Sequence, residues 1–508
     1  MSPWRKSSAQ RWVDGIVRQL LAAVDLGSNS FRLQIARVEG EQLYMRDSLR
    51  ESVRLAGGLT QDKYLDSATQ ERALACLHRF GERLRDLPRE AVRAVGTNSF
   101  RVAKNADEFL QQAEQALGFP IEVIAGYEEA RLIYLGVARC LPQSEQRRMV
   151  MDIGGGSTEF IIGAGLEPQR LASVYMGCVS YSLRFFPDGR VGKSNLKQAE
   201  LAARTELQPY VTEFSKAHWD VALGSSGSAR VLSDILEQND FSVSGITREG
   251  LELLREKMLE AGDVRRLELD GLRGDRIPVL PGGFAIMYAA FCELGIERLH
   301  PALGSLREGV LYDLLGRFHH HDMRDLTVSQ FMSRYHVDVR QAERVAGLAD
   351  QLLRQFRGED DEADDYIFYA LGWAARLHEI GISVAHSGYH RHTAYILANA
   401  DMPGFSSKEQ MNLSLLTLAH RGKLEKISDL DGIQENAVPI MALRLAALFY
   451  RNRSDITLPA MRGSFSGTKF HLTLTPGWLA QNPLTDTALQ EEARQWKALG
   501  MSVEVLEG

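Results

Sequence analysis

Two short glycine-rich turns, each opened by an aspartate, carry the residues best suited to phosphate chemistry. The first reads Asp25-Leu26-Gly27-Ser28-Asn29-Ser30, and the second reads Asp152-Ile153-Gly154-Gly155-Gly156-Ser157-Thr158-Glu159. Glycine lets backbone N–H groups approach a phosphate closely, and Ser and Asn side chains add donors. An aspartate at a strand end suits Mg²⁺, which prefers oxygen ligands and shares them with substrate phosphates. One such turn could be an ordinary hairpin turn. Two at corresponding places indicate a phosphate held from both sides of a cleft.

Each turn lies between two apolar runs, which predicts a strand, a tight turn and a returning strand. The first hairpin covers Ala22–Val38, with Gln42–Ser48 pairing back, and the second covers 148–153, 158–164 and 168–175. The remaining expected strands are 91–96, 121–124 and 221–224. Expected helices are 66–84, one from Asn98, 106–117, one after Gly177, 194–214 and others up to about residue 316. Alternating strands and helices indicate an α/β architecture.

From His319 the character of the sequence changes. The pattern is almost wholly helical to about residue 450, and from about Met461 alternation predicts a few strands and a closing helix. We interpret His319–His321 as an exposed linker and the acidic run 358–365 as a solvated loop.

Length and composition restrict the class of protein. A chain of 508 residues suggests about three domains. No apolar stretch approaches the roughly 18 residues of a membrane span, and 20–24 is too short for a signal peptide. The four cysteines show no metal or disulfide spacing. We therefore expect a cytoplasmic protein, with peripheral membrane association left open. A net charge of −7 argues against nucleic-acid binding, so a polyanion would need a local positive patch.

Several segments carry a resemblance to a known family. The turns 25–31 and 152–159, with Gly224-Ser225-Ser226-Gly227, resemble the actin, sugar-kinase and heat-shock-chaperone superfamily. Segments 96–101, 126–133, 176–180 and 306–310 narrow this to a resemblance with the exopolyphosphatase and guanosine pentaphosphate phosphohydrolase family. Segment 378–397 is similar to the long bacterial exopolyphosphatases. The resemblance implies an α/β fold with two actin-like (ribonuclease H-like) lobes, 1–133 and 134–316. An all-helical HD-like domain, 317–455, and a small α+β tail, 456–508, would follow.

The resemblance also implies roles for single residues. Glu129 matches the general base, although an acidic pair at a helix start is usually solvated and Glu128 is its closest competitor. Asp152 and Glu159, and more weakly Asp25, would hold Mg²⁺, with Mn²⁺ as a substitute. Arg101 would bind substrate phosphate through its planar set of donors. The phosphate cradle would comprise Ser28, Asn29, Ser30, Gly154, Gly155, Gly156, Ser157, Thr158, Gly224, Ser226 and Gly227. For Gly224–Gly227, a plain strand-to-helix turn is nearly as good an interpretation.

The helical region resembles the HD phosphohydrolases, in which a His, a His-Asp pair and a later Asp hold metal. Here the pair reads His378-Glu379, and the helix start that would carry the first His has Gln341. Glutamine replaces imidazole poorly in a divalent metal site, so we expect this domain to have lost its own catalysis. A positive path for polyphosphate could instead use His390, Arg391, His392 and Lys423. Core histidines amid surface charge are an equal alternative.

These residues together predict Mg²⁺-dependent hydrolysis of the terminal phosphate of inorganic polyphosphate, with release of orthophosphate. The near alternative is hydrolysis of the 5′-terminal phosphate of guanosine pentaphosphate (pppGpp) by the same machinery. A kinase of the same superfamily would need an acceptor pocket and an adenosine site, for which the sequence gives no signal. A non-catalytic sensor would not need the three carboxylates. The family often forms dimers through C-terminal regions, so we expect a homodimer.

Overall fold

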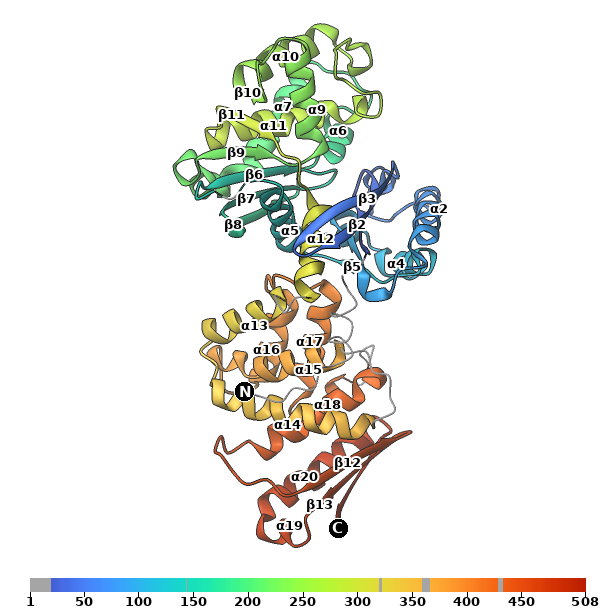
Figure 1. Ribbon diagram of the computed structural model, residues 1–508, viewed down its shortest axis with the longest axis vertical. Helices are drawn as coiled ribbons and strands as arrows, with labels where there is room; N and C mark the ends of the chain where they lie inside the picture. Colours follow the sequence, from blue (N-terminus) through green and yellow to red (C-terminus); the bar gives the residue numbers. More distant parts are fainter. Residues whose placement is uncertain (1–19, 143, 319–321, 359–365, 428–432) are drawn as a thin grey trace. The chain divides into compact units, whose positions relative to one another are not determined.

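The computed structural model describes residues 20–142, 144–318, 322–358, 366–427 and 433–508. The chain forms two compact units, Met1–Asp322 and Met323–Gly508 (Figure 1). The expected linker His319–His321 lies outside the described residues, as does most of the acidic run 358–365.

The first lobe of unit 1 is built on a sheet in the order β3-β2-β1-β4-β5. Its strands are β1 (Leu20–Leu26), β2 (Phe31–Glu39), β3 (Gln42–Glu51), β4 (Val92–Gly96) and β5 (Ile121–Val123). The pairs β1–β2 and β2–β3 are antiparallel, whereas β4 and β5 continue the sheet in parallel. Its helices are α2 (Ser67–Leu84), α3 (Asn98–Val102) and α4 (Ala106–Leu117).

The second lobe repeats this order in the sheet β10-β11-β9-β6-β7-β8. Its strands are β6 (Arg148–Ile153), β7 (Thr158–Ala164), β8 (Glu167–Val174), β9 (Val221–Gly224), β10 (Ile246–Thr247) and β11 (Arg298–Pro301). Its helices are α6 (Cys178–Phe185), α7 (Lys193–Leu207), α8 (Val211–Phe214), α9 (Gly227–Gln238), α10 (Arg248–Ala261) and α11 (Leu280–Leu294). Two hairpins of the same kind, β1–β2 and β6–β7, therefore occupy equivalent places in the two sheets.

Two helices cross between the lobes. Helix α5 (Gly126–Arg139) follows the first sheet in sequence but packs on β7 and β8 of the second, whereas α12 (Leu306–Phe318) follows the second sheet and packs on β1. The helices pack tightly against each other, because a side chain at Gly309 would overlap the carbonyl oxygen of Leu132. The crossing fixes the first turn of α5 against both lobes.

The central strands are buried on both faces. In β1, Ala22, Val24 and Leu26 belong to the outer core of the first lobe, while Leu21 and Ala23 belong to the core shared with α5 and α12. Strand β6 divides its side chains between two cores in the same way. Because successive strand residues point to opposite faces, two covered faces produce the continuous apolar runs seen in the sequence.

Helix α11 is the most apolar helix of unit 1. The window Ile277–Leu294 is long and apolar enough to cross a membrane by composition, but 67% of it is buried inside the protein. Its side chains Phe284, Ile286 and Phe291 are part of the core of the second lobe.

Unit 2 combines helices and a small sheet around one shared core. Its helices are α13 (Met323–Arg334), α14 (Val339–Arg357), α15 (Tyr366–Leu377), α16 (Tyr389–Asn399), α17 (Ser407–Ala419), α18 (Ile433–Phe449), α19 (Trp478–Gln481) and α20 (Pro483–Lys497). The sheet has the order β12-β13-β14, from β12 (Met461–Ser466), β13 (Lys469–Leu474) and β14 (Ser502–Glu507). Phe470 and Trp496 of the tail lie in the same core as the helices.

The expected fold class is confirmed: an α/β unit with two actin-like (ribonuclease H-like) lobes is followed by a helical region and an α+β tail. Two details of the prediction are wrong. Residues 225–316 include the strands β10 and β11, which are too short to show an alternating pattern. The tail closes with strand β14, paired in parallel with β13, rather than with helix α20.

Candidate active site

The two glycine-rich turns meet face to face in unit 1. In the first hairpin Leu26 pairs with Phe31, and in the second Ile153 pairs with Thr158, so each turn projects from the end of its sheet. A Cβ atom added at Gly155 would lie 2.9 Å from Cβ of Ser28. A Cβ atom added at Gly156 would overlap the side-chain amide of Asn98. Only glycine lets the turns approach this closely.

A cavity of about 130 Å³ lies where the turns meet. Most of the residues expected to bind phosphate or to act on it line this cavity. They are Asp25, Ser28, Asn29, Ser30, Glu129, Asp152, Gly154, Gly155, Gly156, Ser157, Ser226 and Gly227. The structure thus brings together four segments that are separate in the sequence, and it lines the cavity with glycines and hydroxyl-bearing residues.

Glu129 is the carboxylate that α5 presents to the cavity. Its Oε2 accepts a hydrogen bond from Nη1 of Arg101 at 2.9 Å, and the same nitrogen donates to the carbonyl oxygen of Ile124 at 2.7 Å. Burial raises the pKa of Glu129, Arg101 lowers it and the charge of Asp152 raises it further. A buried carboxylate with a raised pKa and a fixed orientation has the properties of a general base.

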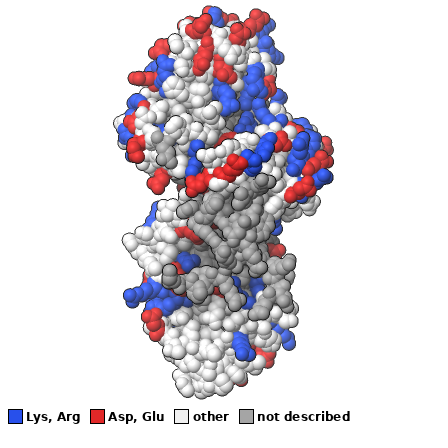
Figure 2. All heavy atoms as spheres, viewed as in Figure 1, with Lys and Arg blue, Asp and Glu red and all other residues white. Residues whose placement is uncertain are grey.

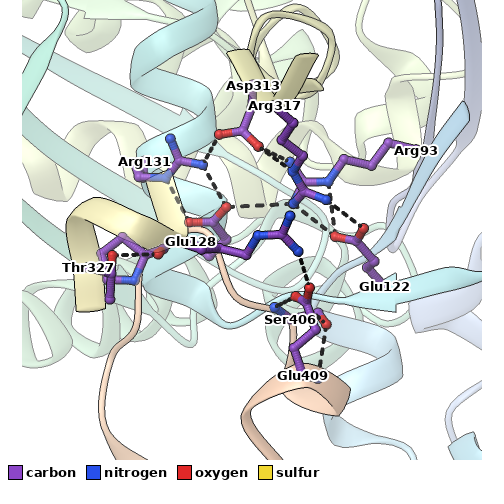
Figure 3. Close-up of polar contacts among 11 residues, drawn as sticks. Arg93, Glu122, Glu128, Arg131, Asp313, Arg317, Thr327, Ser406 and Glu409 are labelled. Atoms are coloured by element: carbon purple, nitrogen blue, oxygen red, sulfur yellow. Dashed lines mark hydrogen bonds and ion pairs between the residues drawn. The ribbon is translucent and has the colours of Figure 1, made fainter. Parts of the chain in front are cut away.

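Glu128, the preceding residue, lies in a different environment. It belongs to a buried ionic network with Arg93, Glu122, Arg131, Asp313 and Arg317 (Figure 3). Arg131 donates to Glu128 through Nε and Nη2, both at 2.8 Å, and to Asp313 at 2.5 Å. Arg93 is therefore a structural residue. The network joins β4, β5, α5 and α12, and it anchors the turn of α5 that carries Glu129.

Three further carboxylates lie near the cavity. Burial raises the pKa of both Asp25 and Asp152 to about 6, and each of the two is raised further by another carboxylate nearby. Asp152 also accepts a hydrogen bond from Ser225 Oγ at 2.6 Å. Glu159 pairs with Asp152 across the hairpin, and burial, followed by the charges of Glu129 and Asp152, raises its pKa. These buried groups repel one another, so a bound cation would be favourable here.

Whether these carboxylates fit Mg²⁺ depends on how many reach one point. No group of three or more His, Cys, Asp or Glu among the described residues is placed to hold one metal ion. Magnesium is often bound by only one or two carboxylates, with water and phosphate oxygens completing its shell. Asp152 at the cavity wall, with Glu159 behind it, fits such an ion.

Two arginines that the sequence interpretation missed also line the cavity. Arg32 pairs directly with Asp25 across the first hairpin, and Arg276 comes from the loop that precedes α11. Burial, followed by the charge of Arg307, lowers the pKa of Arg32 to about 10. Arg276 is 8% exposed, and its guanidinium lies so close to Gly227 that a side chain there would overlap it. Both arginines remain cationic at neutral pH and suit a phosphate ligand. The predicted hairpin could have identified Arg32, whereas nothing in the sequence marks Arg276.

Four expected site residues lie off the cavity wall. Thr158 donates its hydroxyl proton to the carbonyl oxygen of Met176 at 2.5 Å and is fully buried. Glu159 accepts from Ser173 Oγ at 2.9 Å. A side chain at Gly224 would lie 2.5 Å from side-chain atoms of Ala229 and Leu299, so this glycine is a packing position. Arg101 does not line the cavity; it donates a hydrogen bond to Glu129, which does.

Unit 2 contains a separate cavity of about 650 Å³, whose lining includes His378, Glu379, His386 and His420. Gln341 is buried there; its Nε2 donates to the carbonyl oxygen of Tyr450 at 2.8 Å, and its Oε1 accepts from Arg344 at 3.0 Å. The residues suggested for a polyphosphate path, His390, Arg391, His392 and Lys423, lie outside this lining, with Arg391 and Lys423 exposed.

Comparison with known proteins agrees with this geometry. The profile of the Ppx/GppA phosphatase family matches residues 34–318, and that of Ppx/GppA phosphatase domain III matches residues 323–493. An exopolyphosphatase from Cytophaga hutchinsonii is similar in fold, with a TM-score of 0.53 and 24% identity over 59% of this chain and 98% of its own. An exopolyphosphatase-like protein matches with a TM-score of 0.52 and 24% identity, over 58% of this chain and 97% of its own. The chain, whose catalytic lobes and helical region both match, belongs to the Ppx/GppA phosphatase family.

Proposed function

We propose that this phosphatase is an exopolyphosphatase, which removes the terminal phosphate of inorganic polyphosphate with the help of Mg²⁺. The observation that carries the choice of substrate is the lining of the unit 1 cavity. Arg32 and Arg276 lie beside the glycine turns, and none of the described residues in that lining is aromatic. Cationic donors without a stacking surface favour a chain of phosphates over a nucleoside.

Surface charge supports the same choice. Figure 2 shows Lys and Arg side chains gathered where the second lobe of unit 1 faces β3. Arg50 of β3 forms an ion pair with Asp275 of the second lobe at 3.0 Å, next to Arg276. Because the whole chain has a net charge of −7, a polyanion would need a local positive surface such as this one in order to bind.

The residues suggest a division of labour. Backbone N–H groups of Gly155–Ser157 and the Ser28–Ser30 turn would hold the terminal phosphoryl group, and Asp152 with Glu159 would hold Mg²⁺. The ion, when bound, would neutralise charge on the phosphate oxygens. Glu129 would orient a water molecule in line with the leaving oxygen and accept its proton. Arg101 would keep that carboxylate directed at the water.

A side-by-side rate measurement tests the proposal. We expect kcat/KM to be higher for long-chain polyphosphate than for guanosine pentaphosphate, with orthophosphate as the released product. A higher value for guanosine pentaphosphate, without shortening of polyphosphate, would replace this proposal by the pentaphosphatase alternative. Transfer of phosphate to an added acceptor instead of water would assign the chain to the kinases.

A further inference from the structure

The cavity of unit 2 lies at the carboxyl ends of α15, α17 and α18. Its volume of about 650 Å³ lies within the usual range of small-molecule sites. The lining includes four arginines and two glutamates, and both glutamates are already paired: Glu379 with Arg453 and Glu492 with Arg444. Among the described residues of the lining, Arg421 and Arg451 therefore remain without a carboxylate partner.

Two buried histidines present hydrogen-bond acceptors to this cavity. Nδ1 of His378 lies 2.6 Å from the carbonyl oxygen of Ala375, and Nδ1 of His420 lies 2.5 Å from that of Thr417. Because a carbonyl can only accept, each Nδ1 carries the proton. Burial lowers the pKa of both rings, so they are neutral and each Nε2 keeps a lone pair.

The acceptor of His378 lacks a donor in this arrangement. Its Nε2 lies 3.8 Å from Oε1 of Glu379, which is itself an acceptor, and the described residues supply no hydrogen bond to it. His420 is better satisfied, because the hydroxyl of Tyr389 lies 3.3 Å from its Nε2. A 98%-buried imidazole facing a cavity without a donor points to a ligand that brings one.

The other part of the lining is cationic and accessible. Arg421 is exposed and stacks over the ring of Tyr389, 5.2 Å from its centroid. Arg451 donates one hydrogen bond, to the carbonyl oxygen of Leu484 at 3.0 Å. A guanidinium has five N–H donors, so both arginines keep donors for an anion. Outside the lining, burial and then the charges of Arg444 and Arg391 lower the pKa of Lys426 to about 7.

We propose that the unit 2 cavity binds a phosphate-bearing small molecule of nucleotide size. Its phosphates would lie against Arg421 and Arg451, and its amino or hydroxyl donors would reach Nε2 of His378 and the Glu379 carboxylate. A bare phosphate chain satisfies the arginines but brings no donor for Nε2 of His378. Such a site would let the enzyme sense a nucleotide through residues outside the catalytic lobes.

Equilibrium dialysis of the full-length chain tests this site, with Glu129→Gln included in every variant to suppress turnover. The probes are GTP, which carries both phosphates and donors, and tripolyphosphate, which carries phosphates alone. We expect a GTP-binding event, separate from any binding that the unit 1 cavity retains, whose Kd rises at least about tenfold on Arg421→Gln, as for a lost charge-assisted hydrogen bond. Arg462→Gln, an exposed arginine of β12 outside the lining, should leave GTP binding unchanged.

Each remaining outcome is decisive. GTP binding that is absent, or that is insensitive to Arg421→Gln and to Arg451→Gln, would overturn the site. Tripolyphosphate binding that is as tight as GTP binding, and equally sensitive to Arg421→Gln, would show an inorganic phosphate site and overturn the nucleotide assignment. His378→Phe should weaken GTP more than tripolyphosphate, and an unchanged melting temperature would show that the variant remains folded.

Discussion

The carboxylates of Glu128 and Glu129 are adjacent in sequence but belong to separate networks. Glu128 accepts two hydrogen bonds from Arg131 inside the protein, and Glu129 accepts one from Arg101 at the wall of the cavity. Successive residues of a helix are rotated by about 100°, so the two side chains of α5 point in different directions. One residue anchors the helix, and its neighbour is left to act in the site.

Replacing Glu128 tests the anchoring role. Glu128→Gln removes a charge from a buried network with Arg93, Arg131 and Asp313, and breaking a buried pair typically costs about 3–5 kcal/mol. We expect a clearly lower melting temperature by calorimetry, and Glu71→Gln, an exposed glutamate of α2, should leave it unchanged. If the two variants melt alike, the network does not stabilise unit 1.

Arg101 should set the pH range in which Glu129 can act. Its positive charge lowers the pKa of Glu129, so Arg101→Gln should raise that pKa. A base must be deprotonated, and the acid limb of kcat/KM against pH should therefore move to higher pH. Lys104→Gln, on the same segment, should leave the limb in place. A limb that stays put or moves to lower pH in Arg101→Gln would contradict the role of this ion pair.

Asp152 should determine the response to Mg²⁺. Asp152→Asn replaces an anionic ligand by a neutral one, so we expect lower turnover and a higher Mg²⁺ concentration at half-maximal rate. Ser225→Ala keeps the carboxylate and removes only its 2.6 Å hydrogen bond, and its effect should be smaller. A Mg²⁺ titration of Asp152→Asn that overlays that of the parent would exclude the ligand role.

Unit 2 should have no hydrolytic activity of its own. Gln341 is hydrogen-bonded at both ends of its amide, and Glu379 is paired with Arg453 at 2.5 Å. Full-length Glu129→Gln, supplied with Mn²⁺ or Fe²⁺, should therefore leave phosphodiesters and nucleotides intact. Metal-dependent cleavage that disappears on His378→Ala would show a working second centre.

The sequence predicted the hairpins because local patterns encode them, and it predicted the meeting of the turns because two such turns occur at corresponding places. Glycine, aspartate and serine after an apolar run specify a turn, and the first hairpin register also places Arg32 opposite Asp25. The sequence could not place Arg276 in the site, because the loop that carries it is brought to the cavity only by the packing of the second lobe. Glycine turns likewise look alike whether they hold phosphate or, as at Gly224, allow close packing. The crossing of α5 and α12 depends on contacts between distant segments, which no local pattern encodes.

The central claim is that Glu129, in the cleft formed by the two turns, activates the water that releases phosphate. Its most direct test is single-turnover release of orthophosphate from long-chain polyphosphate by Glu129→Gln, at enzyme in excess over chain ends. We expect a rate lower by about 10²–10⁴, as for the loss of a general base, with polyphosphate binding retained. A rate close to that of the parent would contradict the account and transfer the role of base to another carboxylate.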